Sequence, residues 1–163
     1  MAHGRRKGRK PIVKILFING GEKGGNTSRM GRELIGDRGY DQIDLADTKV
    51  YDYGCAFAGG SDDHFEEVIE AVRAAGVLVM GSPVYWHDLS GMMRCLLDRF
   101  YGPVVKGSLS GKRLFFIFQG EAPTPEILER GRYTMERFAS LYGMTFEGMA
   151  TNVETARELG RSI

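Results

Sequence analysis

The sequence predicts a three-layer α/β sandwich built on a five-stranded parallel sheet. Short, nearly continuous apolar runs alternate along the chain with segments of helical periodicity, and glycine-rich or aromatic loops follow two of these runs. At 163 residues, with 42% hydrophobic and 26% charged residues, the chain is long enough for one domain with its own core and short for two. It contains no internal repeat and no low-complexity linker, so a single domain is expected.

Basic charge is concentrated at the start of the chain. The formal net charge is +1, yet residues 1–14 hold six of the 22 basic residues and none of the 21 acidic ones, which leaves the remainder mildly acidic. Residues 1–11 are expected to be a disordered basic leader, because they lack an apolar side chain large enough to anchor them. A secretory signal is not expected, since the apolar run that follows is only seven residues long and contains Lys14.

Features that the sequence lacks indicate its partners and its compartment. No segment approaches membrane-spanning length, and the leader has no aromatic residues interleaved with its charges, as a nucleic-acid binder often has. Two cysteines are too few for a disulfide scaffold or a metal site made of cysteines alone. We therefore expect a cytoplasmic protein that binds neither nucleic acid nor membrane.

The first predicted strand, Ile12–Ile18, is apolar for most of its length and should be buried on both faces. It leads into the glycine-rich loop Asn19–Ser28, and a helix is expected over Arg29–Gly36. Glycines let the backbone approach an anion, and the first turn of a helix offers unpaired N–H groups, so this loop is a candidate phosphate cradle. It resembles a nucleotide-binding P-loop, but Asn26 replaces the lysine and no Mg²⁺-binding apparatus is evident, so a phosphomonoester fits better.

The second strand and the second helix complete the first half of the predicted sheet. Alternating polar and apolar residues predict an edge strand over Tyr40–Leu45. After a loop, a helix is expected from an N-cap at Ser61 to Gly76. Asp62 and Asp63 should stabilise the start of this helix; a role as metal ligands is the less favoured alternative.

The stretch Val77–Tyr101 is the most informative, because it combines a strand, a loop and a helix. Its apolar strand is expected to end at Pro83, which cannot donate to a sheet ladder. Tyr85, Trp86 and His87 then stand just past a strand's carboxyl end, where open parallel sheets bind ligands. The alternative is that the two aromatic residues merely close the core.

The last third of the chain predicts two more strands, with a helix between them. The expected elements are a strand over Arg113–Phe118, a helix capped by Thr124 with Pro125 at its first position, and an edge strand over Met144–Met149. Residues 152–163 form either a short helix or a tail. Five strands and a phosphate loop after the first suit a flavodoxin-like three-layer sandwich of strand order 2-1-3-4-5, with FMN where that order reverses.

Two blocks of the sequence resemble the NAD(P)H-dependent FMN reductases of the flavodoxin-like superfamily. Gly20–Ser28 is similar to their phosphate loop, and Gly81–Trp86 followed by Asp98–Phe100 is similar to their second flavin loop and its helix. The resemblance extends over Ile12–Thr151 and implies an FMN-binding domain at residues 12–151, with residues 152–163 as a C-terminal tail.

The resemblance also implies the residues that contact FMN. The phosphate would be held by Lys23, Asn26, Thr27 and Ser28, the isoalloxazine ring would be flanked by Pro83, Val84, Tyr85 and Trp86, and a third loop would consist of Gln119, Gly120 and Glu121. This chain departs from the family's pattern in the third loop, which is commonly of a Ser/Thr-Gly type, and at Gly21, where a serine is usual. Only Cys55 remains of a cysteine cluster that some relatives carry, so neither an iron–sulfur cluster nor another metal is expected.

The implied activity is the passage of a hydride from NAD(P)H through bound FMN to a small acceptor such as a quinone. The flavin supplies this chemistry, which explains why the sequence shows no catalytic triad. His87 is the candidate proton donor to the reduced acceptor, although a lone loop histidine is more often a polar surface residue. Relatives are typically homodimers, so a homodimer or homotetramer is expected. Two alternatives remain: a flavodoxin-type FMN electron carrier without nicotinamide activity, and a binding module that holds no flavin.

Overall fold

A computed structural model describes residues 13–55 and 62–163, so the expected leader and the expected N-cap at Ser61 lie outside the described residues. The strands are β1 Ile15–Asn19, β2 Asp41–Asp44, β3 Val77–Tyr85, β4 Asp88–Leu89, β5 Arg113–Gln119 and β6 Thr145–Ala150. The helices are α1 Asn26–Ile35, α2 Phe65–Ala74, α3 Gly91–Arg99, α4 Pro125–Tyr142 and α5 Val153–Gly160.

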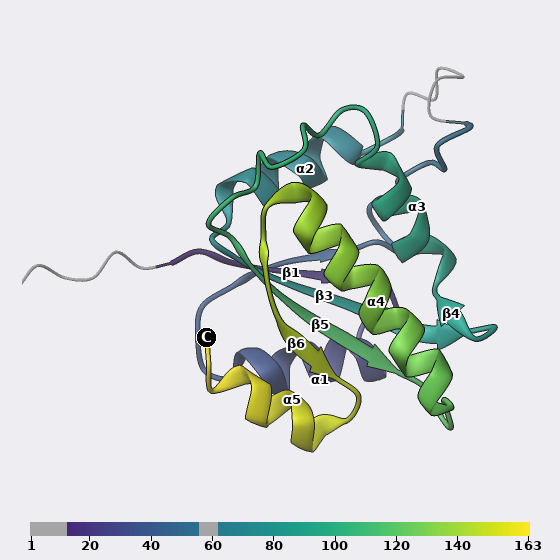
Figure 1. Cartoon of the computed structure of the whole chain (residues 1–163), viewed down its shortest axis with the longest axis vertical. Helices are drawn as coiled ribbons and strands as arrows, with labels where there is room; N and C mark the ends of the chain where they lie inside the picture. Colours follow the sequence, from purple (N-terminus) through teal and green to yellow (C-terminus); the bar gives the residue numbers. More distant parts are fainter. Residues whose placement is uncertain (1–12, 56–61) are drawn as a thin grey trace, which may run out of the picture.

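The five long strands are parallel and lie in the order β2-β1-β3-β5-β6, with the short β4 paired to β3 alone. Leaving out β4, this is the predicted order 2-1-3-4-5, so the predicted fold is confirmed. Helices α2, α3 and α4 cover one face of the sheet, and α1 and α5 cover the other (Figure 1). No helix in the described parts of the chain is both long enough and apolar enough to cross a membrane.

Each face of the sheet has its own core, because successive side chains of a strand point to opposite faces. On β1, Leu16 and Ile18 pack toward α2, α3 and α4, whereas Ile15 and Phe17 pack toward α1 and α5. β3 and β5 alternate in the same way. Burial on both faces explains why these three strands have continuous apolar sequences.

The expected end of the third strand at Pro83 is wrong, since β3 continues to Tyr85. The ladder with β1 reaches only to Gly81, whose carbonyl accepts the Gly20 N–H at 2.7 Å. The ladder with β4 begins at Val84. Pro83 therefore lies between the ladder with β1 and the ladder with β4, where no neighbouring strand needs its missing N–H. On the opposite edge of β3, Pro83 stays in register with Gln119 of β5.

Two helices begin at residues other than those expected. α1 starts at Asn26, three residues earlier than predicted, so the polar end of the glycine-rich loop forms the helix's first turn. α2 starts at Phe65 with His64 as its N-cap, so Asp62 and Asp63 precede the helix and neither is its N-cap. Both aspartates instead bind cationic side chains: Asp62 contacts Lys49 at 2.9 Å, and Asp63 contacts Arg99 at 2.6 Å.

Residues 152–163 contain a helix, the first of the two alternatives for this segment. Asn152 and Thr155 form a capping box at the start of α5, with Asn152 Oδ1 accepting the Thr155 N–H at 2.9 Å. The helix lies against α1, where Gly160 approaches the Leu34 carbonyl so closely that an added Cβ would be 1.9 Å from it. α5 is therefore packed into the second core rather than trailing from it.

Candidate active site

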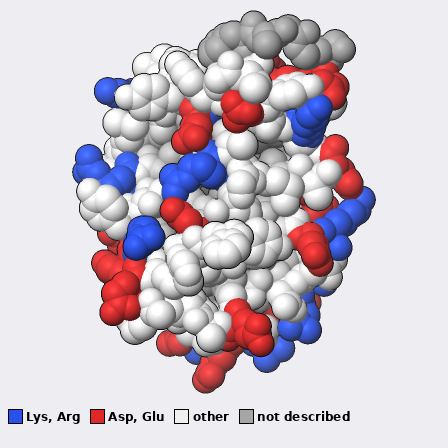
Figure 2. Space-filling model, turned by 90° about the vertical axis from the view of Figure 1, so that its right-hand side faces the viewer, with Lys and Arg blue, Asp and Glu red and all other residues white. Residues whose placement is uncertain are grey.

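Three loops meet at the carboxyl edge of the sheet, after β1, within and after β3, and after β5. Figure 2 shows this face, on which uncharged residues cover much of the middle and many charged side chains lie toward the rim. A cavity of about 320 Å³ lies between the loops. It is lined by Glu22, Gly25, Asn26, Thr27, Pro83, Val84, Tyr85, Gln119, Gly120 and Glu121.

The first loop approaches the second at van der Waals distance, which requires glycine on both sides. A Cβ at Gly20 would lie 3.0 Å from the Gly81 carbonyl oxygen, and one at Gly81 would lie 2.7 Å from Thr27 Cγ2. The N-cap of α1 is Gly25, so no side chain caps the helix. The N–H groups of its first turn are therefore left for an anion, with the positive end of the helix dipole behind them.

The third loop is tied to the first by a side-chain hydrogen bond. Gln119 Nε2 donates to Thr27 Oγ1 at 3.1 Å, which joins the end of β5 to the first turn of α1. Gly120 lies against β3, since a Cβ there would be 3.0 Å from Val84 Cβ. All three loops are thus held by direct contacts around one space.

Two of the residues expected at the phosphate do not line this cavity. Lys23 pairs with Asp47, with 2.5 Å between Nζ and Oδ2, and this hydrogen bond raises the pKa of the lysine above its ordinary value. Ser28 is buried, and its Oγ accepts a hydrogen bond of 3.1 Å from Arg32.

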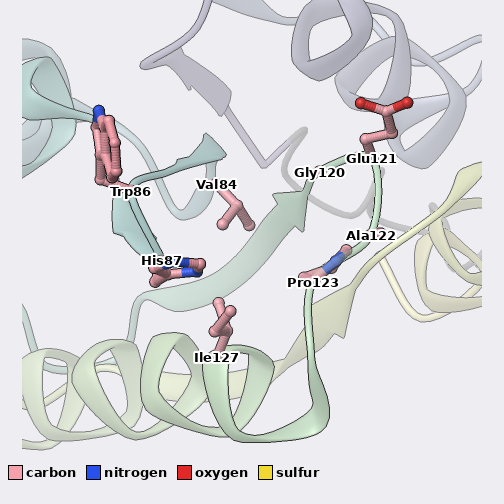
Figure 3. A pocket seen from close by; sticks show the side chains of 8 residues that line it. All are labelled: Val84, Trp86, His87, Gly120, Glu121, Ala122, Pro123 and Ile127. Atoms are coloured by element: carbon pink, nitrogen blue, oxygen red, sulfur yellow. The ribbon is translucent and has the colours of Figure 1, made fainter.

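A second cavity, of about 290 Å³, adjoins the first and shares Val84, Gly120 and Glu121 with it. Its other lining residues are Trp86, His87, Ala122, Pro123 and Ile127. Figure 3 shows the side chains of Val84, His87 and Ile127 pointing toward a common space, while the side chains of Trp86 and Glu121 point away from it. This second cavity is therefore mostly apolar, with one imidazole directed into it.

The position of the His87 imidazole is set by an unusual turn. β3 and β4 form a hairpin whose two central residues, Trp86 and His87, have φ values of 47° and 63°. Positive φ at both positions is typical of a type I′ turn, which normally uses Asn-Gly. A tryptophan and a histidine are strained there, because their Cβ atoms crowd the backbone. Strain of this kind concentrates at functional sites.

The hairpin is fixed to the rest of the edge by polar contacts. Ser90, just after β4, donates its N–H to Ser82 Oγ at 2.9 Å and its hydroxyl to the Gly20 carbonyl at 2.6 Å. Arg94 of α3 pairs with Asp88 at 3.0 Å. These bonds connect the hairpin to both the first loop and α3, so the turn has a defined place at the rim of the second cavity.

Five lining residues of the two cavities were not named as site residues from the sequence, although Glu22 and Gly25 lie in the predicted phosphate loop: Glu22, Gly25, Ala122, Pro123 and Ile127. Ile127 carried a signal, since it lies in the first turn of a helix that begins directly after the third loop. Ala122 and Pro123 form the rest of that loop. The acidic Glu22 has no signal as a lining residue, because a carboxylate is not expected beside an anion cradle.

Comparison with known proteins identifies the chain. The model of the NADPH-dependent FMN reductase family matches residues 13–128. The chain belongs to this family. It is accordingly an NAD(P)H-dependent FMN oxidoreductase whose cofactors are FMN and NAD(P)H. YwqN of Bacillus subtilis strain 168, provisionally named an NAD(P)H-dependent FMN-containing oxidoreductase, is 27% identical over 154 residues, covering 83% of this chain and 82% of YwqN.

Solved structures agree with the reductase fold. The Trp repressor binding protein from Bacillus subtilis is 20% identical, with a TM-score of 0.72 over 89% of this chain and 98% of that one. An NADPH-quinone reductase from P. pentosaceus is 13% identical, with a TM-score of 0.59 over 92% of this chain and 94% of that one. At these identities the likeness shows the fold alone.

The observed donor set of this FMN reductase suits its cofactor. The lining of the first cavity includes an uncapped helix start with short polar side chains, as a phosphate requires. Pro83, Val84 and Gly120 also line this cavity and offer the close, uncharged walls that a flat ring requires.

Proposed function

We propose that this reductase passes a hydride from NAD(P)H through FMN to a small, flat acceptor such as a quinone. The supporting observation is that two cavities share the wall formed by Val84, Gly120 and Glu121. One has the features of a cofactor site and the other those of a substrate site, so a ring in the first would lie beside a molecule in the second.

In this proposal the first cavity seats the cofactor. Asn26, Thr27 and the first-turn N–H groups of α1, that of Ser28 included, hold the phosphate, with Lys23 only at the periphery. Pro83, Val84, Tyr85, Gln119 and Gly120 surround the ring, while Trp86 and Glu121 stand at its edge. When bound, FMN accepts a hydride from the nicotinamide and returns electrons to the acceptor.

The second cavity would take the acceptor. Val84, Pro123 and Ile127 are apolar, so this cavity would favour a flat, uncharged molecule over water. His87 would donate a proton to the oxygen of the reduced acceptor, since an imidazole can give up a proton near neutral pH. The solved NADPH-quinone reductase of the same fold supports a quinone as the acceptor.

We further propose that the protein acts as a homodimer or homotetramer in the cytoplasm, with small molecules rather than nucleic acids or membranes as its other partners. Exposed apolar side chains support self-association: Tyr101 is 67% exposed and Val105 is 70% exposed, both just after α3. Sedimentation velocity measures the oligomeric state directly, and a monomer at micromolar concentration would refute this part of the proposal.

Absorbance spectroscopy tests the proposed activity. The purified protein is incubated with FMN, freed of excess, and mixed anaerobically with NADPH or NADH and then with a quinone. Retained flavin bands that bleach with the nicotinamide and return with the quinone support the proposal. Retained bands that do not bleach favour the flavodoxin-type carrier, and a protein that retains no flavin favours a binding module.

A further inference from the structure

Three consecutive side chains at the start of α1 each accept a hydrogen bond from a neighbouring residue. Arg29 Nη2 donates to Asn26 Oδ1 at 3.2 Å, and Gln119 Nε2 donates to Thr27 Oγ1 at 3.1 Å. The third, Ser28 Oγ, accepts from Arg32 as described above. In all three, the side-chain oxygen already accepts a hydrogen bond from another residue of the protein.

This pattern fixes which atoms remain available. A guanidinium can only donate, so the oxygen of the Asn26 amide must face Arg29 and the Nδ2 branch is left over. Among the described residues, neither Asn26 Nδ2 nor the Thr27 hydroxyl hydrogen has an acceptor. Both residues line the first cavity. Their side chains can therefore still donate hydrogen bonds to a ligand, as can the N–H groups of the first turn of the helix.

The orientation of these donors matters because the described lining of the cavity contains no cationic side chain. Lys23 is engaged by Asp47. Glu22 and Glu121 line the same cavity, and their negative charge opposes an anion. Recognition of a phosphate must therefore come from neutral donors and the helix dipole, and an amide turned to present its oxygen would repel the ligand.

We propose that Arg29 is a positioning residue, which acts through Asn26 to turn its amide donor toward the FMN phosphate and so lets the cradle prefer FMN to riboflavin. The inference rests on the proposed seat of FMN in the first cavity. Arg29 itself is exposed and does not line the cavity, so its effect passes through the hydrogen bond to Asn26.

The test compares two ligands that differ only in the phosphate. Dissociation constants of FMN and riboflavin are measured by flavin fluorescence for the wild type and Arg29→Met. The preference for FMN should fall about five- to tenfold in the variant, the equivalent of one net hydrogen bond, while riboflavin binding stays unchanged. Arg29→Gln keeps a donor at the i+3 position and should restore part of the preference without restoring the charge.

Two controls separate orientation from charge and from general structure. Arg32→Met removes the same charge from the same helix, but its partner Ser28 does not line the cavity, so the preference should change less than twofold. In an Asn26→Ala background, Arg29→Met should have no further effect, because the amide through which it acts is gone.

The outcomes distinguish the inference from the function on which it rests. A wild type that binds neither flavin overturns the proposed function and the inference with it. If the wild type prefers FMN, any of three results overturns the inference alone. The preference for FMN is unchanged in Arg29→Met, it falls equally in Arg32→Met, or Arg29→Met lowers it by the same factor in the Asn26→Ala background as in the wild type.

Discussion

The guanidinium of Arg99 donates to both carboxylate oxygens of Asp63, at 3.0 and 2.6 Å, while it lies 4.7 Å from the centre of the Phe65 ring. Arg99 also donates to the Tyr51 carbonyl at 3.1 Å. One side chain at the end of α3 therefore holds the loop after β2 and the start of α2. The arginine is 8% exposed, so little water is available to replace these bonds.

Removing the charge of Asp63 should destabilise the protein substantially. Asp63→Asn leaves the Arg99 cation nearly buried without a counter-charge, and we expect a loss of about 3 kcal/mol in the free energy of unfolding. Urea denaturation followed by far-ultraviolet circular dichroism measures it. The control is Glu136→Gln, which breaks an exposed pair with Arg132 at 3.1 Å and should cost less than about 0.5 kcal/mol. Equal losses would show that the Arg99 pair contributes no more than a surface pair.

The same pair makes stability depend on pH. The hydrogen bonds from Arg99 hold the pKa of Asp63 below its ordinary value of 3.8. A carboxyl whose pKa is lowered by folding stabilises the protein fully above the unfolded pKa, and this contribution is lost as the pH falls through the folded pKa. The difference in urea midpoint between wild type and Asp63→Asn should therefore be constant near neutral pH and shrink below about pH 4. A difference that stays constant down to pH 2 would contradict the assignment.

Relieving the strained hairpin turn should stabilise the protein. Trp86 is 94% exposed and has a φ of 47°, so Trp86→Asn loses almost no buried area and places a residue that tolerates this conformation. We expect a gain of about 1 kcal/mol and a higher melting temperature by calorimetry. Tyr133→Asn is the matched control, an exposed aromatic residue of α4 at 61% exposure, where asparagine should not stabilise. No gain in Trp86→Asn would mean that the turn is not strained.

Gly160 should not tolerate a side chain. A Cβ there would lie 1.9 Å from the Leu34 carbonyl oxygen, a backbone atom that cannot move without shifting α1. Gly160→Ala should therefore cost more than about 2 kcal/mol, as overpacking against backbone does. Gly91→Ala, at the start of α3 with no atom within 4 Å of the added Cβ, should be neutral or slightly stabilising. Equal urea midpoints for the two variants would contradict the close packing of α5 on α1.

Replacing His87 should slow the reoxidation of the flavin by the acceptor and leave its reduction by NAD(P)H unchanged. His87→Asn keeps a residue that tolerates positive φ, so the turn persists while the imidazole is lost. Anaerobic bleaching by NAD(P)H should proceed at the wild-type rate, and reoxidation by a quinone should slow about 10²-fold, the lower end of a general acid's contribution. Stopped-flow absorbance resolves the two steps. Unchanged reoxidation would remove His87 from the proton-donor role.

The order of the sheet could be predicted because the signals were local and consistent. Ile15–Ile18, Val77–Met80 and Leu114–Phe118 are buried on both faces, and a continuous apolar run is the sequence pattern that such burial produces. The glycine-rich loop and the aromatic loop each follow such a run. Since carboxyl ends of parallel strands share an edge, the two loops had to meet.

The rest depended on contacts between distant residues. Whether Pro83 ends β3 is decided by where the ladders with β1 and β4 stop and start, which no local pattern records. The ion pair between Asp63 and Arg99 joins residues that are 36 positions apart, so no local pattern predicts it. The sequence places Lys23 in the phosphate loop, but it does not show that Lys23 also pairs with Asp47 of a different loop. Each of these features depends on which distant residues become neighbours when the chain folds.

The exposed position of Trp86 makes its fluorescence a probe of the carboxyl edge of the sheet. It is the single tryptophan of the sequence. Since its ring is already in water, its emission should hardly change when the chain unfolds. The same ring stands at the rim of the second cavity, so energy transfer to a bound flavin should quench it. Tryptophan emission in this protein would thus follow ligand binding almost free of any contribution from folding.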